Sequence, residues 1–176
     1  MIFSKPTLLA ISTLCTVWPV LAATNLAHSI SDMDRLTTAI TAAKSSLDNY
    51  HGGKAAAIPV SSSIYQAKNA AQAARKSLTS GDPLTTDEAT KYYEAYARMC
   101  PELLDAINAG TEKAPLLKQA GVAPLSRKLV QGLQDEKLQF EKAAQAQVPP
   151  EVFNKATPCL DQVSHAFDEV QGALQD

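Results

Sequence analysis

Three consecutive serines form the part of the chain best suited to bind a charged group: Ser61, Ser62 and Ser63. They follow a glycine pair at residues 52–53, which is typical of a helix end, and Pro59, which is typical of the approach to a new helix. At the N-terminus of that helix, the hydroxyls, the free backbone N–H groups and the helix dipole would favour an anion such as a carboxylate. Capping of the helix by serine explains the same residues at least as well.

The helix expected next, from about residue 60 to residue 79, has an unusually thin apolar face. Its inward positions at helical spacing are Ile64, Ala67, Ala71, Ala74 and Leu78. Because alanine fills little volume, either neighbouring helices approach closely over this face, or space remains beside it for an apolar molecule that the chain does not supply. We therefore expect Ile64, Ala67 and Ala71 to line any binding cavity.

Two more groups of residues are candidates for a cavity wall. The first is a run of tyrosines: Tyr92, Tyr93 and Tyr96. They lie too close in sequence to share one helix face, so at least one hydroxyl should reach water or a cavity. An aromatic core with hydroxyls at the surface is the simpler explanation, and the wall of a ligand tunnel is the alternative. The second group, Leu116 and Leu117, lies in a proline- and glycine-interrupted connection at residues 109–123, which predicts a flap.

The chain lacks the usual signatures of catalysis and of metal binding. His28, His51 and His165 belong to no metal-binding motif, and no nucleophile elbow or phosphate-binding glycine loop occurs. Acidic pairs such as Asp168 and Glu169 are adjacent, so they do not face one another on a helix. We therefore expect no enzymatic activity, no metal site and no cofactor.

The first 22 residues are typical of a secretory signal peptide. Lys5 supplies a positive N-terminal region, an apolar run follows, and Val20 to Ala22 fits a cleavage site. Residues 23–176 are then expected to form a single secreted domain. Without Lys5, the 16 basic residues become 15 against 18 acidic ones, a net charge of about −3 that argues against a nucleic-acid partner.

Helical periodicity runs through most of residues 25–174, and no segment alternates as a strand would. The expected helices span about 25–50, 60–79, 86–107, 124–146 and 150–174. The third should begin with a capping box formed by Thr85 and Glu88. This pattern predicts an all-α fold. The short connections favour an antiparallel bundle of about five helices, and the thin face of the second helix suggests an internal apolar cavity.

Two cysteines remain once the signal peptide is removed, Cys100 and Cys159. An even pair in an oxidising compartment favours a disulfide over two free thiols. In an up-and-down bundle the third and fifth helices run parallel, and the two cysteines fall at similar heights along them. We predict that the disulfide joins these two helices.

The order of several short motifs resembles the fungal hydrophobic surface-binding protein A family, which includes cell-wall galactomannoproteins. The motifs are the Gly52-Gly53 turn with Ala-Ile-Pro-Val-Ser-Ser, Leu-Thr-Thr-Asp-Glu, Cys-Pro-Glu-Leu-Leu-Asp-Ala-Ile, Lys-Ala-Pro-Leu-Leu and Val-Pro-Pro-Glu-Val. The resemblance covers about residues 25–174. It implies a helical bundle, secretion or association with the cell wall, binding to hydrophobic surfaces and, for some members, enclosure of a long-chain fatty acid.

Three functions are compatible with these features. The first is a non-enzymatic carrier that binds a fatty acid or similar amphiphile between its helices, in a largely apolar cavity. The second is a surface-active coat or adaptor that adsorbs to hydrophobic surfaces or the cell wall and recruits secreted hydrolases. The third, an inhibitor of a secreted glycosidase or esterase, has only fold analogy in its favour. The oligomeric state is not determined by the sequence.

Overall fold

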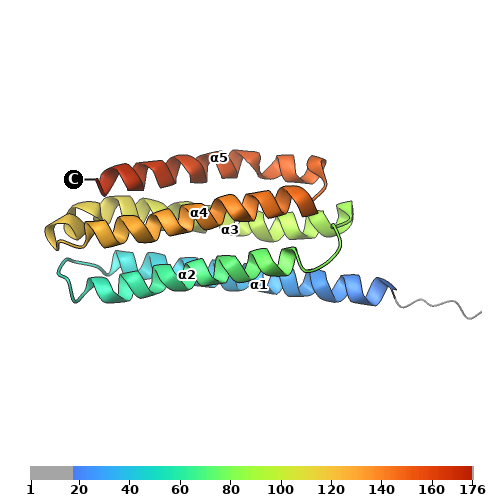
Figure 1. Ribbon diagram of the computed structural model, residues 1–176, viewed down its shortest axis with the longest axis horizontal. Helices are drawn as coiled ribbons and strands as arrows, with labels where there is room; N and C mark the ends of the chain where they lie inside the picture. The colour runs from blue at the N-terminus through green and yellow to red at the C-terminus, as the bar shows by residue number, and fades with distance from the viewer. Residues whose placement is uncertain (1–17, 176) are drawn as a thin grey trace, which may run out of the picture.

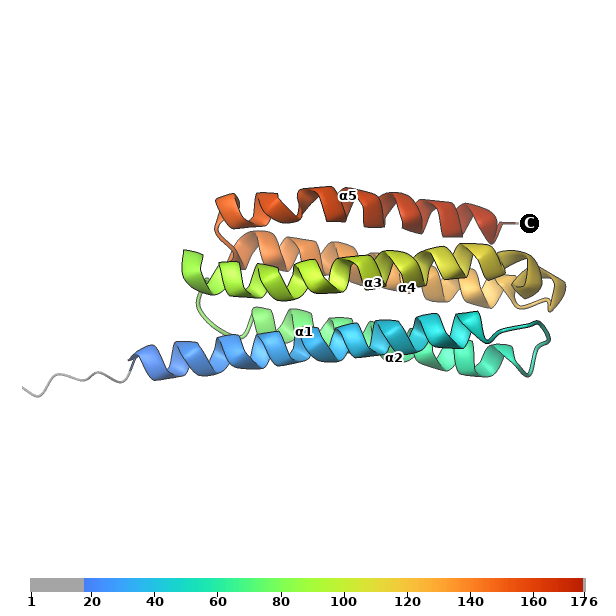
Figure 2. The same cartoon turned by 180° about the vertical axis from the view of Figure 1, so that it is seen from behind.

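The computed structural model describes residues 18–175, which form five helices joined by short connections. The helices are α1 (Trp18–Asp48), α2 (Ala57–Leu78), α3 (Thr86–Gln119), α4 (Ala123–Gln147) and α5 (Pro150–Ala173). They run alternately in opposite directions along an elongated bundle, as Figures 1 and 2 show from two sides. The predicted all-α antiparallel architecture is confirmed. Residues 1–17, most of the predicted signal peptide, lie outside the described part, so the signal peptide stays a prediction.

The five helices form a ring in cross-section. Helix α1 packs against α2 and α3, α2 packs against α4, and α5 closes the ring against both α3 and α4. Helices α3 and α4 touch each other only slightly across the middle. In Figure 1, α1 and α2 lie below α3 and α4, and α5 lies above them. A ring of five helices encloses more axial space than four would, so this packing leaves room for an internal cavity.

Helix α3 begins as predicted, with a capping box. The Thr85 side-chain oxygen accepts a hydrogen bond from the Glu88 backbone N–H, and the Glu88 carboxylate accepts one from the Thr85 backbone N–H at 3.0 Å. These bonds to the charged carboxylate, first from the backbone and then from the hydroxyl, lower the pKa of Glu88. The local sequence alone therefore determines where α3 starts.

The predicted start of α2 is wrong by about one turn. The helix begins at Ala57, its N-cap is Ala56, and no side chain caps it. Pro59 is the third residue of the helix, where its missing N–H costs nothing because the first four N–H groups have no partner within a helix. The three serines therefore lie inside the helix and do not begin it.

The predicted flap at residues 109–123 is also wrong, because α3 continues through it to Gln119. The helix contains Pro101 and Pro115, each of which removes a backbone hydrogen bond. Ala114 and Leu117 are buried against the core on either side of Pro115. We attribute the continuity of α3 to this burial, which offsets the cost of the proline. The chain turns only at residues 120–122, where Gly121 adopts a positive φ of 69°.

The predicted disulfide between Cys100 and Cys159 is confirmed. It joins the middle of α3 to α5, with the two Cα atoms 6.4 Å apart. The two helices run parallel and pack along their length, which brings the cysteines to the same height. The disulfide therefore fixes one side of the helical ring.

Candidate functional site

The main cavity of the bundle has a volume of about 140 Å³ and is lined by all five helices. Its wall extends from Leu36 to Leu47 on α1, from Ile64 to Ala71 on α2, from Tyr96 to Leu117 on α3, from Ser126 to Glu141 on α4, and from Leu160 on α5 to Leu174, the C-cap of that helix. Leu160 and Leu174 are 14 positions apart, or roughly 21 Å at 1.5 Å per residue. The cavity is therefore long and follows the bundle axis.

Apolar side chains make up nearly all of this wall. Leucine, isoleucine, valine and phenylalanine dominate, and the thin face of α2 contributes Ala67 and Ala71. The ionisable groups in the wall are the Tyr96 phenol and three side chains of α4: Glu136, Lys137 and Glu141. A cavity of this composition suits an apolar molecule with one polar end.

The charged side chains of the wall form two separate pairs. Glu136 is only 2% exposed, and its carboxylate accepts a hydrogen bond from Arg75 Nε of α2 at 2.6 Å. Lys137 Nζ contacts Glu141 Oε1 at 2.7 Å and donates a hydrogen bond to Ser164 Oγ of α5. Each buried charge therefore has a partner of opposite sign, as burial requires.

A second, smaller cavity of about 40 Å³ lies next to the first, towards the start of α3 and α5. Its wall includes Tyr92 and Tyr93, and it shares Tyr96, Phe140, Glu141 and Leu160 with the main cavity. The two spaces are therefore neighbours separated by shared side chains.

The three tyrosine hydroxyls have different surroundings. Tyr93 Oη donates to the Lys155 carbonyl at 3.2 Å, and Tyr96 Oη donates to Cys159 Sγ at 3.2 Å. Among the described residues, Tyr92 Oη has no hydrogen-bond partner. Burial raises the pKa of Tyr92 and of Tyr96 well above the usual value of a phenol, with smaller contributions from Asp32 and from Glu141 respectively.

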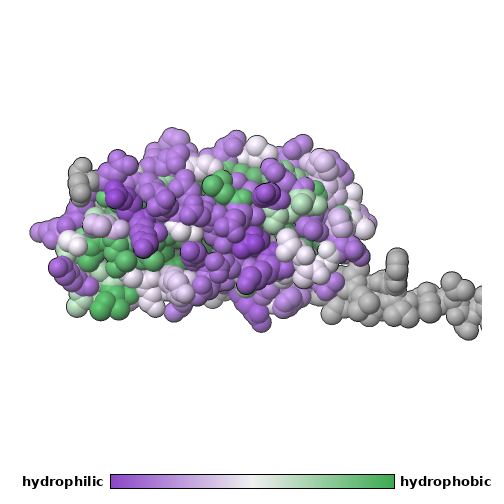
Figure 3. Space-filling model, viewed as in Figure 1, coloured by the Kyte–Doolittle hydropathy of each residue, from purple (hydrophilic) through white to green (hydrophobic). Residues whose placement is uncertain are grey.

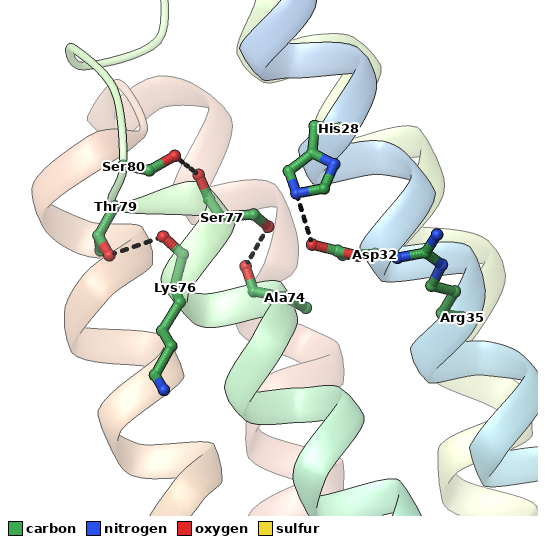
Figure 4. Close-up of polar contacts among 8 residues, drawn as sticks. All are labelled: His28, Asp32, Arg35, Ala74, Lys76, Ser77, Thr79 and Ser80. Atoms are coloured by element: carbon green, nitrogen blue, oxygen red, sulfur yellow. Dashed lines mark hydrogen bonds and ion pairs between the residues drawn. The ribbon is translucent and has the colours of Figure 1, made fainter.

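Beyond the last α1 and α2 residues of the cavity wall, Leu36 and Ala71, polar side chains lie on both helices, and Figure 4 shows their contacts. Asp32 lies one turn before Leu36 and is buried, with Arg35 Nη1 at 3.0 Å and His28 Nε2 at 3.4 Å from its carboxylate oxygens. On α2, Ser77 is buried and donates to the Ala74 carbonyl at 3.0 Å. Neither residue lines the cavity, and buried apolar side chains such as Met33 and Leu78 fill the space around them.

The structure places the predicted site residues in four different environments. Five of them line the main cavity: Ile64, Ala67, Ala71, Tyr96 and Leu117. Tyr92 and Tyr93 line the smaller cavity, and Leu116 packs against the core. The serines lie outside both walls: Ser61 Oγ donates to the Ala57 carbonyl, Ser63 Oγ donates to the Val60 carbonyl, and Ser62 is exposed. A role for the serines in binding the head group stays a prediction. It no longer has the support of a helix N-terminus, because the serines lie inside α2.

Sequence reasoning missed Lys137 and Glu141. The apolar positions of α4 step through Val130, Leu133 and Phe140, and a helical stripe requires an inward residue between the last two. That inward position falls at Glu136 and Lys137. A charged residue in the gap of an apolar stripe was therefore the signal that could have identified this site.

Residues 18–175 contain no cluster of three or more histidine, cysteine, aspartate or glutamate side chains able to hold a metal ion. Over the same residues, no helix is both long enough and apolar enough to cross a membrane.

Fold and cavity together define the class of this protein, an all-α antiparallel bundle with an apolar cavity along its axis. The chain belongs to the hydrophobic surface binding protein A family, whose family model matches residues 26–146. The family resemblance predicted from the order of motifs is thus confirmed. None of the curated proteins is significantly similar to this chain in sequence.

Several solved structures share the fold at low sequence identity. The complex of AFMP4P with palmitic acid is 19% identical with a TM-score of 0.79, and the match covers 88% of this chain and 99% of that one. Ligand binding domain 1 of the Penicillium marneffei MP1 protein, complexed with arachidonic acids, is 17% identical with a TM-score of 0.77, over 83% of this chain and 95% of that one. These likenesses establish the fold.

Proposed function

We propose that this protein is a secreted, non-enzymatic carrier that binds a long-chain fatty acid or a similar amphiphile in its main cavity. The observation that carries the proposal is the long apolar cavity along the bundle axis, which all five helices line. An apolar cavity with a few polar groups suits a ligand with a hydrocarbon tail and one polar end.

Two comparisons support this choice of ligand. Structures of the same fold contain palmitic acid in AFMP4P and arachidonic acids in the MP1 protein. The name of the family refers to hydrophobic surfaces, which present the same chemistry as an acyl tail. Secretion fits the predicted signal peptide, and association with the cell wall fits the family resemblance.

The cavity must expand to hold such a ligand. Its volume of about 140 Å³ is close to that of an engineered apolar cavity that binds benzene, about 150 Å³, and a long-chain acid is much larger. Met99 is a flexible residue of the wall that can change rotamer to enlarge the main cavity. A rotation of Phe140, which lines both cavities, would open the shared wall into the smaller one. Helix α4 can also move away from α3, because those two helices touch only slightly.

A second candidate function is adsorption to hydrophobic surfaces, as a coat or as an adaptor for secreted hydrolases. Among the residues whose burial the structure describes, 25–175, four large apolar side chains are exposed: Ile58, Tyr65, Leu125 and Leu138. Figure 3 shows apolar side chains gathered at the end of the bundle where α2 and α4 begin, and Ile58 and Leu125 lie in the first turns of those helices. This end of the bundle would contact the surface.

Native mass spectrometry of the secreted protein tests the proposal and separates the two candidates. A carrier is expected to co-purify with a lipid and, once stripped, to bind palmitate saturably. The chain without its signal peptide has no tryptophan, so tyrosine emission should report that binding. An empty protein that adsorbs to hydrophobic beads, and that neither palmitate nor a fluorescent fatty acid saturates, would instead support surface adsorption.

A further inference from the structure

The main cavity has a single cationic side chain in the part of its wall that the structure describes, Lys137 of α4. This side chain is only 13% exposed, so its ammonium group lies largely out of bulk water. A carboxylate placed in an apolar cavity needs positive charge or hydrogen-bond donors, because burying it alone is very costly. Lys137 is therefore the residue of the wall whose chemistry fits a carboxylate.

The contacts of Lys137 leave it able to bind one more acceptor. An ammonium group has three N–H donors. One donates to Ser164 Oγ, whose own hydrogen is committed to the Leu160 carbonyl at 2.8 Å. Glu141 Oε1 lies 2.7 Å from Nζ as an ionic contact, without a hydrogen bond of good geometry. The remaining donors therefore have no hydrogen-bond partner among the described residues. Ser164 thus holds the ammonium in place while leaving a donor free.

Glu141 is the group that a ligand carboxylate would displace. Its side chain is 19% exposed and borders both cavities, so it can turn towards solvent. Its Oε1 atom is buried and, despite the ionic contact, accepts no hydrogen bond of good geometry from any described residue. The other charged pair of the wall cannot serve in this way, because Glu136 is buried and held by Arg75.

The position of Lys137 also suits the tail of the ligand. From Lys137 the wall of α4 continues for 11 residues to Ser126, or roughly 16 Å. At that end of the bundle the wall is completed by Leu47, Leu117 and Leu174. A head group at Lys137 would therefore have an apolar path of long-chain length in front of it.

We propose that Lys137 binds the carboxylate head group of the fatty acid, with Ser164 positioning the ammonium and Glu141 giving way. This inference rests on the proposed function and replaces the serines of α2 as the head-group site.

The test compares palmitate with hexadecanol, the alcohol of the same chain length, on the stripped full-length mature protein. Lys137→Met should weaken palmitate binding by about 10- to 100-fold, the scale of a hydrogen bond to a charged group, and should leave the alcohol nearly unchanged. Lys142→Met is the matched control, since Lys142 is an exposed lysine of the same helix that lines neither cavity. It should bind both ligands as the wild type does.

A second variant gives an effect of opposite sign and keeps the test valid if Lys137→Met folds poorly. Glu141→Gln removes the competing charge at constant size, so it should strengthen palmitate binding several-fold without affecting the alcohol. The inference is overturned if Lys137→Met weakens the binding of palmitate and of hexadecanol equally. It is also overturned if neither variant changes palmitate binding relative to hexadecanol binding. If only Ser63→Ala weakens palmitate binding without weakening hexadecanol binding, the head group binds at the serines of α2 and the inference is wrong. Failure of the wild type to bind either ligand would instead refute the proposed function.

Discussion

Arg75 and Glu136 form a buried ion pair, and removing one partner should cost more stability than removing the other. It joins α2 to α4 across the ring, with Nε and Oε1 2.6 Å apart. The Glu136 side chain is 3% exposed, whereas that of Arg75 is 23% exposed. Arg75 can therefore reach water when its partner is removed, and Glu136 cannot.

This difference in exposure determines how much free energy of unfolding each substitution should cost. Arg75→Met leaves a buried carboxylate without its counter-charge, which should lower the free energy of unfolding by about 3–5 kcal/mol. For a chain of this size, that corresponds to a fall in Tm of about 6–20 °C. Glu136→Met leaves an arginine that can turn towards solvent, so we expect a loss of about 1 kcal/mol. The double variant replaces both charges by apolar side chains and should lie within about 1 kcal/mol of the wild type.

Urea unfolding followed by circular dichroism provides the four free energies of this double-mutant cycle. The slope of the free energy against urea should stay the same in all four proteins, so that the midpoints can be compared directly. Equal losses in the two single variants would refute the reasoning from burial. A loss below about 1 kcal/mol in Arg75→Met would show that Glu136 finds another partner or water.

The remaining predictions concern the disulfide, the buried phenols and the helix cap. Cys100→Ser should cost about 4 kcal/mol, because the link to Cys159 closes a loop with a sequence separation of 59 residues, while helicity should persist; free thiols in the denatured, unreduced wild type would contradict the link. Burial raises the pKa of Tyr92 and of Tyr96, so above pH of about 10 the unfolded chain loses phenol protons that the folded chain keeps, and stability that is intact below that pH should fall as the pH rises. Absorbance titration should accordingly show these phenols ionising only on unfolding, and early ionisation of all tyrosines would argue against their burial. Thr85→Ala should cost about 1 kcal/mol in urea unfolding, and an unchanged midpoint would mean that the cap contributes nothing.

Local features of the sequence determined most of the secondary structure. The apolar spacing of three and four residues, the Thr85 capping box and the proline at the start of α5 act within a few residues, so they could be interpreted without tertiary information. Short connections then restricted the topology to an up-and-down bundle. The parallel course of the third and fifth helices made the Cys100–Cys159 link predictable as well.

Tertiary packing decided the features that local rules predicted wrongly. Pro115 and Gly121 indicated a flap, but burial of Leu117 against the neighbouring helices keeps α3 helical to Gln119. Pro59 indicated a boundary, but a proline in the first turn of a helix has no backbone hydrogen bond to lose. The serines of α2 consequently lie inside the helix, and the hydroxyl groups of Ser61 and Ser63 donate to its carbonyls.

The polar part of the cavity was likewise decided by the tertiary structure. The sequence by itself determined an apolar stripe on each helix, and it could place Ala67 and Ala71 on an inward face. Which charged residue reaches the cavity depends on partners from other helices: Ser164 of α5 for Lys137, and Arg75 of α2 for Glu136. A buried charge is tolerated only where such a partner lies within hydrogen-bond distance, and that distance exists only once the five helices have closed their ring.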